Sequence, residues 1–299
     1  MNPPSVAIIV VNYRGRADTL ECLESLRRLT YPSFSVLLVD QDSGDGTPDT
    51  VRERFPEVDV VESLENDGFS GANNRAAKRA LEKGADYLFL LNNDTVVAPD
   101  LLDVLVGGAE SVPEIGIAGP VMLYFDAPDT VWSMGGAMSW RGESRMIGQG
   151  RAASEVGSDS PLVDVEFIVG CGLLVKRAVW EAAGGMDGRF FLYYEEADLC
   201  AWVRRAGWRC VTVPGARLQH KVSRTTGTDS ALTLYYMRRN VLLFLEKNAS
   251  RPNFARLAAS ADTLRLALVW ALRGDRRCRT LLYALSDYYR GCLGKSQHP

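Results

Sequence analysis

Three side chains that could bind a cation follow directly after one apolar run. Asn92, Asn93 and Asp94 come next to Tyr87–Leu91, five apolar residues in a row. Such a run is typical of a strand buried on both faces of a parallel sheet, and open α/β sheets bind ligands where their strands end. A carboxylate there can hold a hard divalent cation, and the cation can hold a diphosphate. Asn and Asp are also common turn residues, so this stretch alone favours an ordinary polar turn.

A second group of ionisable side chains lies in residues 190–208, FFLYYEEADLCAWVRRAGW. Aromatic residues lead into Glu195 and Glu196, which we predict to open a helix. Acidic residues at a helix start complement the helix dipole, and this explains the pair without any chemistry. The chain has two histidines, and His298 lies in the extreme tail, so His220 is the one imidazole available to a site. Tyr193 and Tyr194 could either pack in the core or contact a bound substrate, and both alternatives stay open. We assign Trp132 and Trp140 to the core.

The elements that would position these groups alternate between strands and helices. This alternation implies right-handed crossovers and a parallel sheet, so we predict an α/β fold. We expect Asp18 and Glu21 to form a capping box for the first helix and Thr47 to cap the second. The first four predicted strands are Val6–Val11, Val36–Val39, Val58–Val61 and Tyr87–Leu91.

The pattern is less regular after residue 99. We predict hairpins and a mobile loop over residues 125–163, and two helices over 253–293 that break near Gly274-Asp275. The other predicted elements are helices at Pro99–Ser111 and Arg177–Ala183 and strands at Ile115–Val121, Val163–Val175 and Val211–Val213.

Several classes of protein are disfavoured by the sequence. The turn after the first strand reads NYRGRADT, without the GxGxxG of a dinucleotide-binding fold, and no GxxxxGK[ST] occurs. The six cysteines form no CxxC pair, which argues against zinc and disulfides and indicates a reducing, cytoplasmic compartment. Residues 1–5 lead straight into a strand, so we expect no signal peptide, and no apolar run approaches the length of a membrane span.

Charge is distributed unevenly along the chain. Residues 251–299 hold nine Arg and Lys and three Asp, a net charge of +6, while the whole chain carries −3. The first 250 residues therefore carry −9. A basic tail suits an anionic partner, although no aromatic-interleaved basic motif supports nucleic acid. Two hypotheses stay open for the tail: peripheral contact with a membrane, or packing on the body or on a second subunit as a homodimer.

A series of short motifs makes the chain resemble the inverting glycosyltransferases of family 2, which have the GT-A fold, and above all their bacterial rhamnosyltransferase-like members. Each motif is weak alone, but all occur in the family's order over about residues 5–245. They are VVNYRG (10–15), VDQDSGDGT (39–47), ENDGFSGANN (65–74), LLNNDT (90–95), GCGLLVKR (170–177), FFLYYEEADLCAWVRRAG (190–207) and His220.

The resemblance implies a set of residues that bind the donor nucleotide sugar. Val11 and Tyr13 match the strand end that contacts the base. Asp40 matches the carboxylate that hydrogen-bonds the pyrimidine or its ribose. Gly71 and Asn73 lie in the segment that passes near the nucleotide. The expected donor is a dTDP- or UDP-sugar, with rhamnose as the expected sugar.

The resemblance also implies the residues of the chemistry. Asn92, Asn93 and Asp94 stand where the family has its metal-bearing Asp-x-Asp motif. Asp94 and His220 would bind Mn²⁺ or Mg²⁺, and the cation would stabilise the leaving diphosphate. Glu196 matches the catalytic base, which takes the proton of the acceptor hydroxyl.

Two positions depart from the family pattern. Asn92 replaces an aspartate, and a neutral amide is a weaker ligand than a carboxylate, so Asp94 must dominate metal binding. The acidic pair is Glu-Glu where Glu-Asp is commoner, and the extra methylene moves the base by about 1.5 Å. Neither departure excludes activity.

Together these features predict a glycosyltransferase that acts with inversion on a saccharide or lipid-linked saccharide, in the assembly of cell-envelope polysaccharide or glycolipid. We expect it in the cytoplasm or on the inner face of the membrane. Two alternatives are a non-catalytic module that binds nucleotide sugars or glycans on the same fold, and a sugar-phosphate nucleotidyltransferase, whose glycine-rich opening is missing. The expected organisation is a GT-A domain at 1–245, with a nucleotide-binding half at about 1–120 and an acceptor half at about 121–245, and a helical extension at 246–299.

Overall fold

The first half of the molecule is a parallel sheet with helices packed on it. The structure is a computed structural model that describes residues 3–222 and 230–298. Four strands pair in parallel in the order β4-β1-β2-β3, as the alternating pattern predicts. They are β1 (Val6–Asn12), β2 (Phe34–Gln41), β3 (Asp59–Ser63) and β4 (Tyr87–Asn92), and the helices between them are α1 (Arg16–Leu26), α2 (Thr47–Arg54) and α3 (Gly68–Glu82).

The second half extends the same sheet through one antiparallel strand. β11 (Gly172–Lys176) lies between β4 and β6 (Ile115–Tyr124) and runs antiparallel to both. β12 (Arg209–His220) then pairs in parallel with β6. The remaining elements are β5 (Thr95–Val97), α4 (Leu101–Glu110), β7 (Ala127–Ser133), the hairpin β8 (Gly136–Met138) and β9 (Ser144–Met146), the 3₁₀ turn η1 (Ala153–Glu155), β10 (Val163–Asp164), α5 (Arg177–Ala183) and α6 (Glu195–Arg205).

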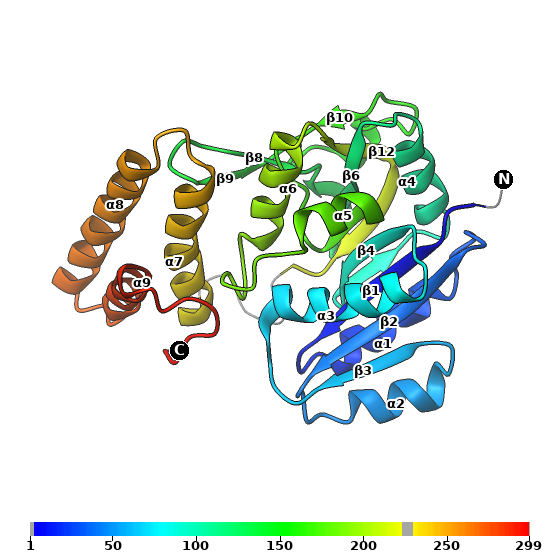
Figure 1. The fold of residues 1–299 in the computed structure, drawn as a ribbon, viewed down its shortest axis with the longest axis horizontal. Coiled ribbons are helices and arrows are strands. Elements are labelled where there is room, and N and C mark those ends of the chain that lie inside the picture. The colour runs from blue at the N-terminus through cyan, green and yellow to red at the C-terminus, as the bar shows by residue number, and fades with distance from the viewer. Residues whose placement is uncertain (1–2, 223–229, 299) are drawn as a thin grey trace.

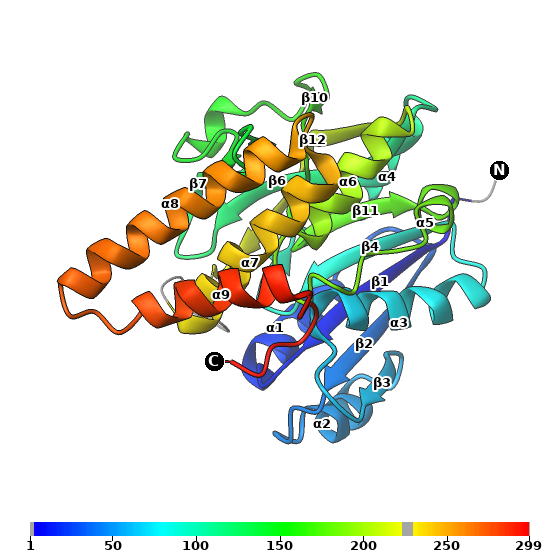
Figure 2. The same cartoon turned by 60° about the vertical axis from the view of Figure 1, so that its left-hand side comes forward.

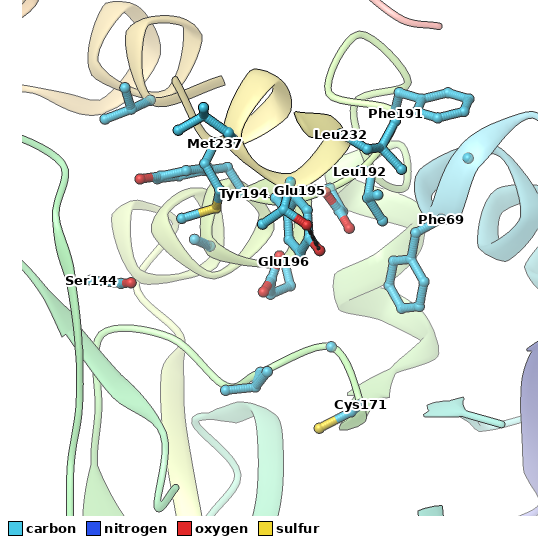
Figure 3. Close-up of a pocket in the computed structure, with 18 of the residues that line it drawn as sticks. Phe69, Ser144, Cys171, Phe191, Leu192, Tyr194, Glu195, Glu196, Leu232 and Met237 are labelled. Carbon is cyan, nitrogen blue, oxygen red and sulfur yellow. Dashed lines mark hydrogen bonds between the residues drawn. The ribbon is translucent and has the colours of Figure 1, made fainter. Parts of the chain in front are cut away.

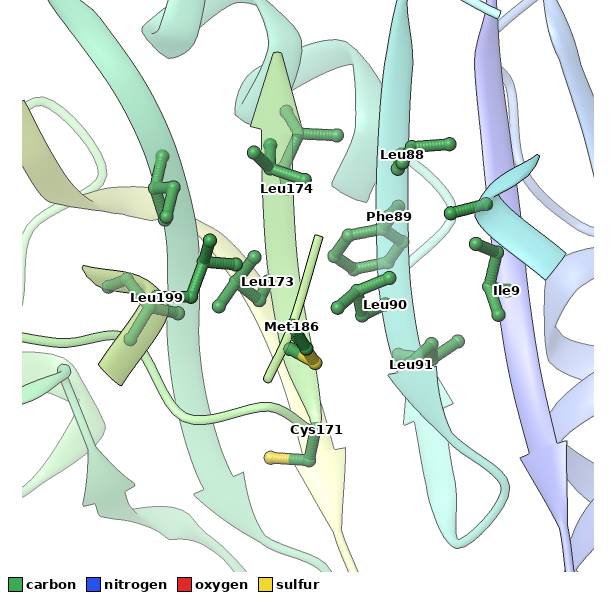
Figure 4. Packing of buried hydrophobic residues seen from close by; sticks show 14 of the residues in the cluster. Ile9, Leu88, Phe89, Leu90, Leu91, Cys171, Leu173, Leu174, Met186 and Leu199 are labelled. Carbon is green, nitrogen blue, oxygen red and sulfur yellow. The ribbon is translucent and has the colours of Figure 1, made fainter. Parts of the chain in front are cut away.

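The core is centred on β4, whose run of apolar side chains is covered on both faces. Phe89, Leu90 and Leu91 are fully buried, and Figure 4 shows them between Ile9 of β1 and Leu173 of β11. Burial of this kind contributes about 1.5–3 kcal/mol for each large apolar side chain. The packing fixes β4, and so the position of the polar residues that follow it.

Three helices gather at one end of the molecule. α7 (Ala231–Asn248), α8 (Pro252–Leu272) and α9 (Cys278–Arg290) pack on one another, and α8 lies farthest from the sheet (Figures 1 and 2). The predicted pair of helices with a break near Gly274-Asp275 is confirmed. α7 was not predicted from the sequence, and it runs through residue 245, where the predicted GT-A domain ends. The division into domains stays a prediction. In the described ranges, no helix has the length and apolar character needed to cross a membrane.

Both predicted helix caps are wrong. α1 begins at Arg16 behind Gly15, so Asp18 lies inside its first turn. Asp18 and Glu21 instead bind the buried ammonium of Lys221, at 2.5 and 2.6 Å, because this cation needs paired charge. The cap of α2 is Gly46 in the left-handed conformation. There the Asp45 carboxylate accepts hydrogen bonds from the Thr47 amide and hydroxyl at 3.0 and 2.6 Å.

Two predicted strands have different bounds. Residues 163–175 are not one strand: β10 and β11 at its ends pair with neighbouring strands, and between them Phe167 forms a single isolated bridge with Gly136. The strand predicted at Val211–Val213 extends over twelve residues and ends with His220 itself. Pairing with β6 continues to His220 past an irregularity between Val213 and Arg217, and β5 pairs with the last three residues on the other side. His220 is therefore buried at a strand end and is not a surface histidine in a loop.

Candidate active site

A cavity of about 870 Å³ opens where β1, β4 and β12 end. Its size is typical of a site for a small molecule. One end is polar and lies at the strand ends, and the other end reaches the helices α7 and α8. The predicted site residues that line the cavity are Val11, Tyr13, Asn92, Asn93, Asp94, Glu196 and His220.

Three other predicted site residues lie behind the cavity wall. Asp40 is buried, and its two carboxylate oxygens accept hydrogen bonds from Asn12 Nδ2 at 2.6 Å and from the Ser43 amide at 3.0 Å. Gly71 and Asn73 belong to α3, and Asn73 Nδ2 donates to the Phe69 carbonyl at 2.8 Å. These contacts shape the backbone next to the polar end of the cavity. Direct contact of the three residues with a nucleotide stays a prediction.

Asn12, which was not among the predicted site residues, organises the polar end of the cavity, called the donor end below. It is fully buried at the end of β1 and donates to Asp40 and to Ser43 Oγ. Its Oδ1 accepts from Asn93 Nδ2 at 3.1 Å and from Thr19 Oγ1 at 2.8 Å. Asn12 thus ties the turns after β1, β2 and β4 together. The only sequence signal was its place within the VVNYRG motif.

Asp94 and His220 come together at the donor end although 125 residues separate them in sequence. His220 Nε2 lies 3.1 Å from Asp94 Oδ1, and both side chains are more than nine-tenths buried. Among the described residues, Asp94 Oδ1 has no hydrogen-bond partner apart from this contact with the imidazole, and His220 Nδ1 has none. A buried carboxylate oxygen next to a buried imidazole suits a divalent cation.

The described residues hold no cluster of three or more His, Cys, Asp or Glu at which a cation could be bound by protein alone. The remaining ligands would have to come from substrate oxygens, water or the Asn92 amide, as at many Mg²⁺ sites. Burial lowers the pKa of His220, but the Cys171 sulfur and the Asp94 carboxylate outweigh it and raise this pKa to about 10. A cation bound to the imidazole nitrogen would therefore replace a proton. The residues present fit a cation site completed by the donor diphosphate.

Glu195 and Glu196 open α6, as predicted, and project into the middle of the cavity (Figure 3). Burial, and then the charge of Glu196, raise the pKa of Glu195 well above its usual value. Burial also raises the pKa of Glu196, against hydrogen bonds from backbone amides that include Gly170. The charge of Glu196 disfavours a second charge on Glu195, so the pair holds one negative charge more readily than two. A pair that keeps one proton and carries one charge can accept a proton from a substrate, and Glu196 stays the predicted base.

The backbone just before this pair is strained. Phe191, Tyr193 and Tyr194 have φ values of 66°, 69° and 75°, a region that non-glycine residues rarely adopt. Such conformations cost about 1–3 kcal/mol each and persist only when the surroundings enforce them. Gly68 at the start of α3 is part of these surroundings, because a Cβ there would lie 2.2 Å from the Phe191 carbonyl oxygen. The strain places the two carboxyl groups in the cavity.

Two adjacent residues of α7 hold the strained segment, and no sequence motif pointed to them. Asn240 Nδ2 lies 2.8 to 2.9 Å from the carbonyl oxygens of Phe190, Leu192 and Tyr193. Arg239 is fully buried, and its Nη2 donates to the Phe190 carbonyl at 2.9 Å. Its Nε also donates to Asn240 Oδ1 at 2.9 Å, which orients the amide. α7 thus acts as a brace for the residues before Glu195.

The end of the cavity away from Asp94 is mainly apolar. Met138 and Met146 of the β8–β9 hairpin, Met237 of α7 and Trp270 of α8 line it. Arg238 also lines this end, and it makes no hydrogen bond or ion pair with any described residue. A free guanidinium beside apolar walls can bind a substrate that carries both an anionic group and an apolar chain.

The aromatic residues considered in the sequence differ in position. Trp132 packs partly buried against the core, as predicted, and it also lines the cavity, 4.6 Å from the His220 ring between centroids. Trp140 is 54% exposed, so its assignment to the core was wrong. Tyr193 and Tyr194 both line the cavity, and the Tyr194 hydroxyl donates to the Gly142 carbonyl at 2.9 Å. Contact of either tyrosine with a sugar stays a prediction.

The sheet order and the site at its strand ends define the GT-A fold of glycosyltransferases. The fold is similar to that of a mannosyltransferase from Pyrobaculum calidifontis solved with GDP-Man and Mn²⁺, with a TM-score of 0.60, 18% identity, and coverage of 96% of this chain and 87% of that one. It is also similar to GalNAc-T7 solved with UDP, GalNAc and Mn²⁺, with a TM-score of 0.64, 16% identity, and coverage of 81% and 48%.

The sequence places the chain within this class. Residues 3–242 match the family model described as Glycosyltransferase like family 2, so the chain belongs to that family. It is 28% identical to an N-acetylglucosaminyl-diphospho-decaprenol L-rhamnosyltransferase of Mycobacterium tuberculosis, over 95% of this chain and 94% of that protein. It is 21% identical to the dTDP-rhamnosyl transferase RfbF of Shigella flexneri, over 82% and 81%. The predicted family is confirmed, and it favours an enzyme over a non-catalytic binding module.

Proposed function

We propose that this glycosyltransferase moves rhamnose from dTDP-rhamnose to a hydroxyl of a diphosphate-linked lipid saccharide, with inversion at the anomeric carbon. The observation that carries the proposal is the place of Glu196, one of two adjacent carboxyls at the start of α6, between a polar and an apolar end of one cavity. The donor and acceptor come from the names of the two rhamnosyltransferase relatives. Such an acceptor implies work at the cytoplasmic face of a membrane.

In this mechanism each end of the cavity holds one substrate. Val11, Tyr13 and the Asn12-organised turns hold the nucleotide, and the apolar end holds the lipid-linked acceptor. Glu196 takes the proton from the acceptor hydroxyl, which attacks the anomeric carbon from the side opposite the diphosphate. Glu195 stays protonated and does not compete for that proton.

Asp94 and His220 would hold a divalent cation, Mn²⁺ or Mg²⁺, which when bound supplies a Lewis acid that neutralises charge on the diphosphate. Two features support this assignment: the buried Asp94 carboxylate faces the buried imidazole at an oxygen-rich strand end, and His220 Nδ1 has no hydrogen-bond partner among the described residues. Trp132 packs against the imidazole and keeps it turned toward the cavity. Both fold relatives were solved with Mn²⁺.

The direct test is to incubate the protein with Mn²⁺ and a soluble short-chain diphosphate-linked N-acetylglucosamine, in parallel reactions with dTDP-rhamnose and with UDP-sugars. Release of nucleoside diphosphate and the anomeric configuration of the product, read by NMR, are the measurements. We expect transfer from dTDP-rhamnose and inverted configuration. A product that retains the donor configuration would rule out a single displacement with Glu196 as base. Transfer only from UDP-sugars would rule out dTDP-rhamnose as the donor.

A further inference from the structure

Helix α8 turns its large apolar side chains away from the protein. Five of them are between 50% and 80% exposed and recur at spacings of three, four and seven residues, so they lie on one helix face. Contiguous apolar surface of this kind marks a site of contact with a partner or a membrane. The five residues, called the apolar stripe below, are Phe254, Leu257, Leu264, Leu268 and Leu272.

The opposite face of α8 is occupied by small residues. Ala255, Ala259, Ser260, Thr263 and Ala267 are its buried positions, and α8 packs there against α7 and α9. Small side chains allow the helices to approach closely, but they leave the larger leucines without a role in the fold. The apolar stripe therefore does not serve the core of this chain.

The C-terminal residues that include the stripe also carry unpaired positive charge. Two of the three aspartates in residues 251–299 are paired with arginines, Asp262 with Arg141 and Asp275 with Arg277. The third, Asp287, accepts a hydrogen bond from the Tyr235 hydroxyl. In contrast, six exposed arginines make no ion pair with any described residue, so they do not neutralise the acidic body. They are Arg251, Arg265, Arg273, Arg276, Arg279 and Arg290.

An aromatic pair extends the stripe at its N-terminal end. Trp140 of the turn between β8 and β9 stacks on Phe254 with ring centroids 5.6 Å apart, and both rings are more than half exposed. The guanidinium of Arg141 lies over the Trp140 ring. Exposed tryptophan beside arginine is typical of proteins that sit at the headgroup level of a bilayer.

The helix that carries the stripe is also a wall of the active-site cavity. Ala259, Asp262 and Trp270 line the cavity from other faces of α8. An α-helix with its side chains is about 10 Å thick, so a surface that contacts the stripe lies about one helix diameter from the cavity. A lipid-linked acceptor anchored in that surface needs to move only a short distance to reach the apolar end.

We propose that α8 docks the protein on an anionic lipid bilayer, with the apolar stripe and the Trp140–Phe254 pair in the interface and the free arginines on the lipid headgroups. This inference rests on the proposed use of a lipid-linked acceptor, and it assigns the surface that brings the cavity to it. The arginines favour an anionic bilayer over a second copy of the chain, because the same basic face on a partner would repel them.

The test measures sedimentation of the full chain with vesicles of phosphatidylcholine alone and with added phosphatidylglycerol, at low and high salt. We expect binding to the anionic vesicles that weakens with salt. The triple variant Leu257→Gln, Leu264→Gln, Leu268→Gln should bind about tenfold or more weakly while keeping the melting temperature, because its positions are exposed. Arg265→Gln with Arg273→Gln should reduce the effect of salt. The control Leu64→Gln changes a leucine that is 98% exposed far from the stripe and should change nothing.

Activity separates docking from chemistry. The triple variant should transfer sugar to a soluble short-chain acceptor at the wild-type rate, and should lose most transfer to the same acceptor embedded in vesicles. A wild-type protein that ignores anionic vesicles at low salt would overturn the docking proposal. So would a wild-type dimer in analytical ultracentrifugation that the triple variant dissociates, because the stripe would then be an interface between copies. Absence of transfer to the soluble acceptor would instead overturn the proposed function and leave the vesicle result valid.

Discussion

The side-chain amide of Asn240 donates a hydrogen bond to the carbonyl oxygen of Tyr193, at 2.9 Å and across 47 residues of sequence. The same amide lies within 2.8 Å of the Phe190 and Leu192 carbonyl oxygens. α7 thereby holds the left-handed backbone that places Glu195 and Glu196 in the cavity. A residue in the C-terminal helices thus positions the proposed base without touching a substrate.

Asn240→Ala should therefore lower kcat by about tenfold to a hundredfold while leaving the KM for the donor nearly unchanged. The physical reason is that a misplacement of the reacting groups by about 1 Å can cost a hundredfold in rate. Unpaired carbonyls should also cost about 1–3 kcal/mol of unfolding free energy, measured by urea denaturation. The control is Asn248→Ala, which removes an amide of the same helix that bonds Asp198 and not the 190–194 segment. Equal losses of kcat in both variants would contradict the positioning role.

Glu196→Gln should bind the donor normally and lose about 10²–10⁴-fold in kcat, because the amide cannot accept the hydroxyl proton. Glu195→Gln should lose much less, since Glu195 keeps its proton in the active enzyme. Initial rates of nucleoside diphosphate release and donor titrations monitored by calorimetry give the two measurements. Near-wild-type turnover of Glu196→Gln would remove it as the base.

The rate should rise with pH, with an apparent pKa above the ordinary value of 4.5, because burial raises the pKa of Glu196 and the ionised form is needed. The Glu195→Gln variant should show the same increase of rate with pH. If Glu195 is neutral in the wild-type enzyme, its replacement by a neutral amide changes no charge beside Glu196. The folded pair binds protons more tightly than the unfolded chain, so the free energy of unfolding should fall as the pH rises through the raised pKa values. Thermal melts at several pH values should show that the melting temperature decreases less with rising pH in Glu195→Gln than in the wild type. A rate that is flat from pH 4 upward would contradict the assignment.

Asp94→Asn should weaken cation-dependent binding of dTDP, because the remaining oxygen ligands are neutral amides and water. EDTA should abolish activity, and Mn²⁺ should restore it at least as well as Mg²⁺, since imidazole suits softer ions. Calorimetry of dTDP with and without Mn²⁺ measures this without turnover. Asp42→Asn is the matched control, an exposed aspartate near the same sheet edge that does not line the cavity. Full activity in EDTA would show a site that works without a cation.

Arg238→Ala should raise the KM for a diphosphate-linked acceptor by about tenfold or more, with little change in kcat. The reason is that its guanidinium lines the apolar end and pairs with no residue that the structure describes. An uncharged glycoside acceptor should show no such change. Arg28→Ala, an exposed arginine on the nucleotide-binding half, is the control. An equal rise in KM for the diphosphate-linked and the uncharged acceptor would contradict the assignment of Arg238 to the diphosphate.

The sequence by itself determined the local elements and the chemistry they carry. The apolar run of β4 and the polar residues after it predicted a buried strand with a site at its end, because burial on both faces requires such a run. Glu195-Glu196 at a helix start and His220 were found because motif order identifies a family. The break near Gly274-Asp275 was found because Gly and Asp interrupt a helical pattern.

Only the tertiary structure decided which of these residues meet. Asp94 and His220 are neighbours because β12 crosses back to pair with β5 and β6, and Asn240 reaches Tyr193 because α7 packs beside α6. Tertiary contact also explains why Asp18 and Glu21 do not cap α1. The buried ammonium of Lys221, 200 residues after Glu21 in the sequence, pairs with both carboxylates. The apolar stripe of α8 shows the same limit. Periodicity alone cannot tell which face of an apolar helix is covered, because that depends on whether the small or the large residues meet its neighbours.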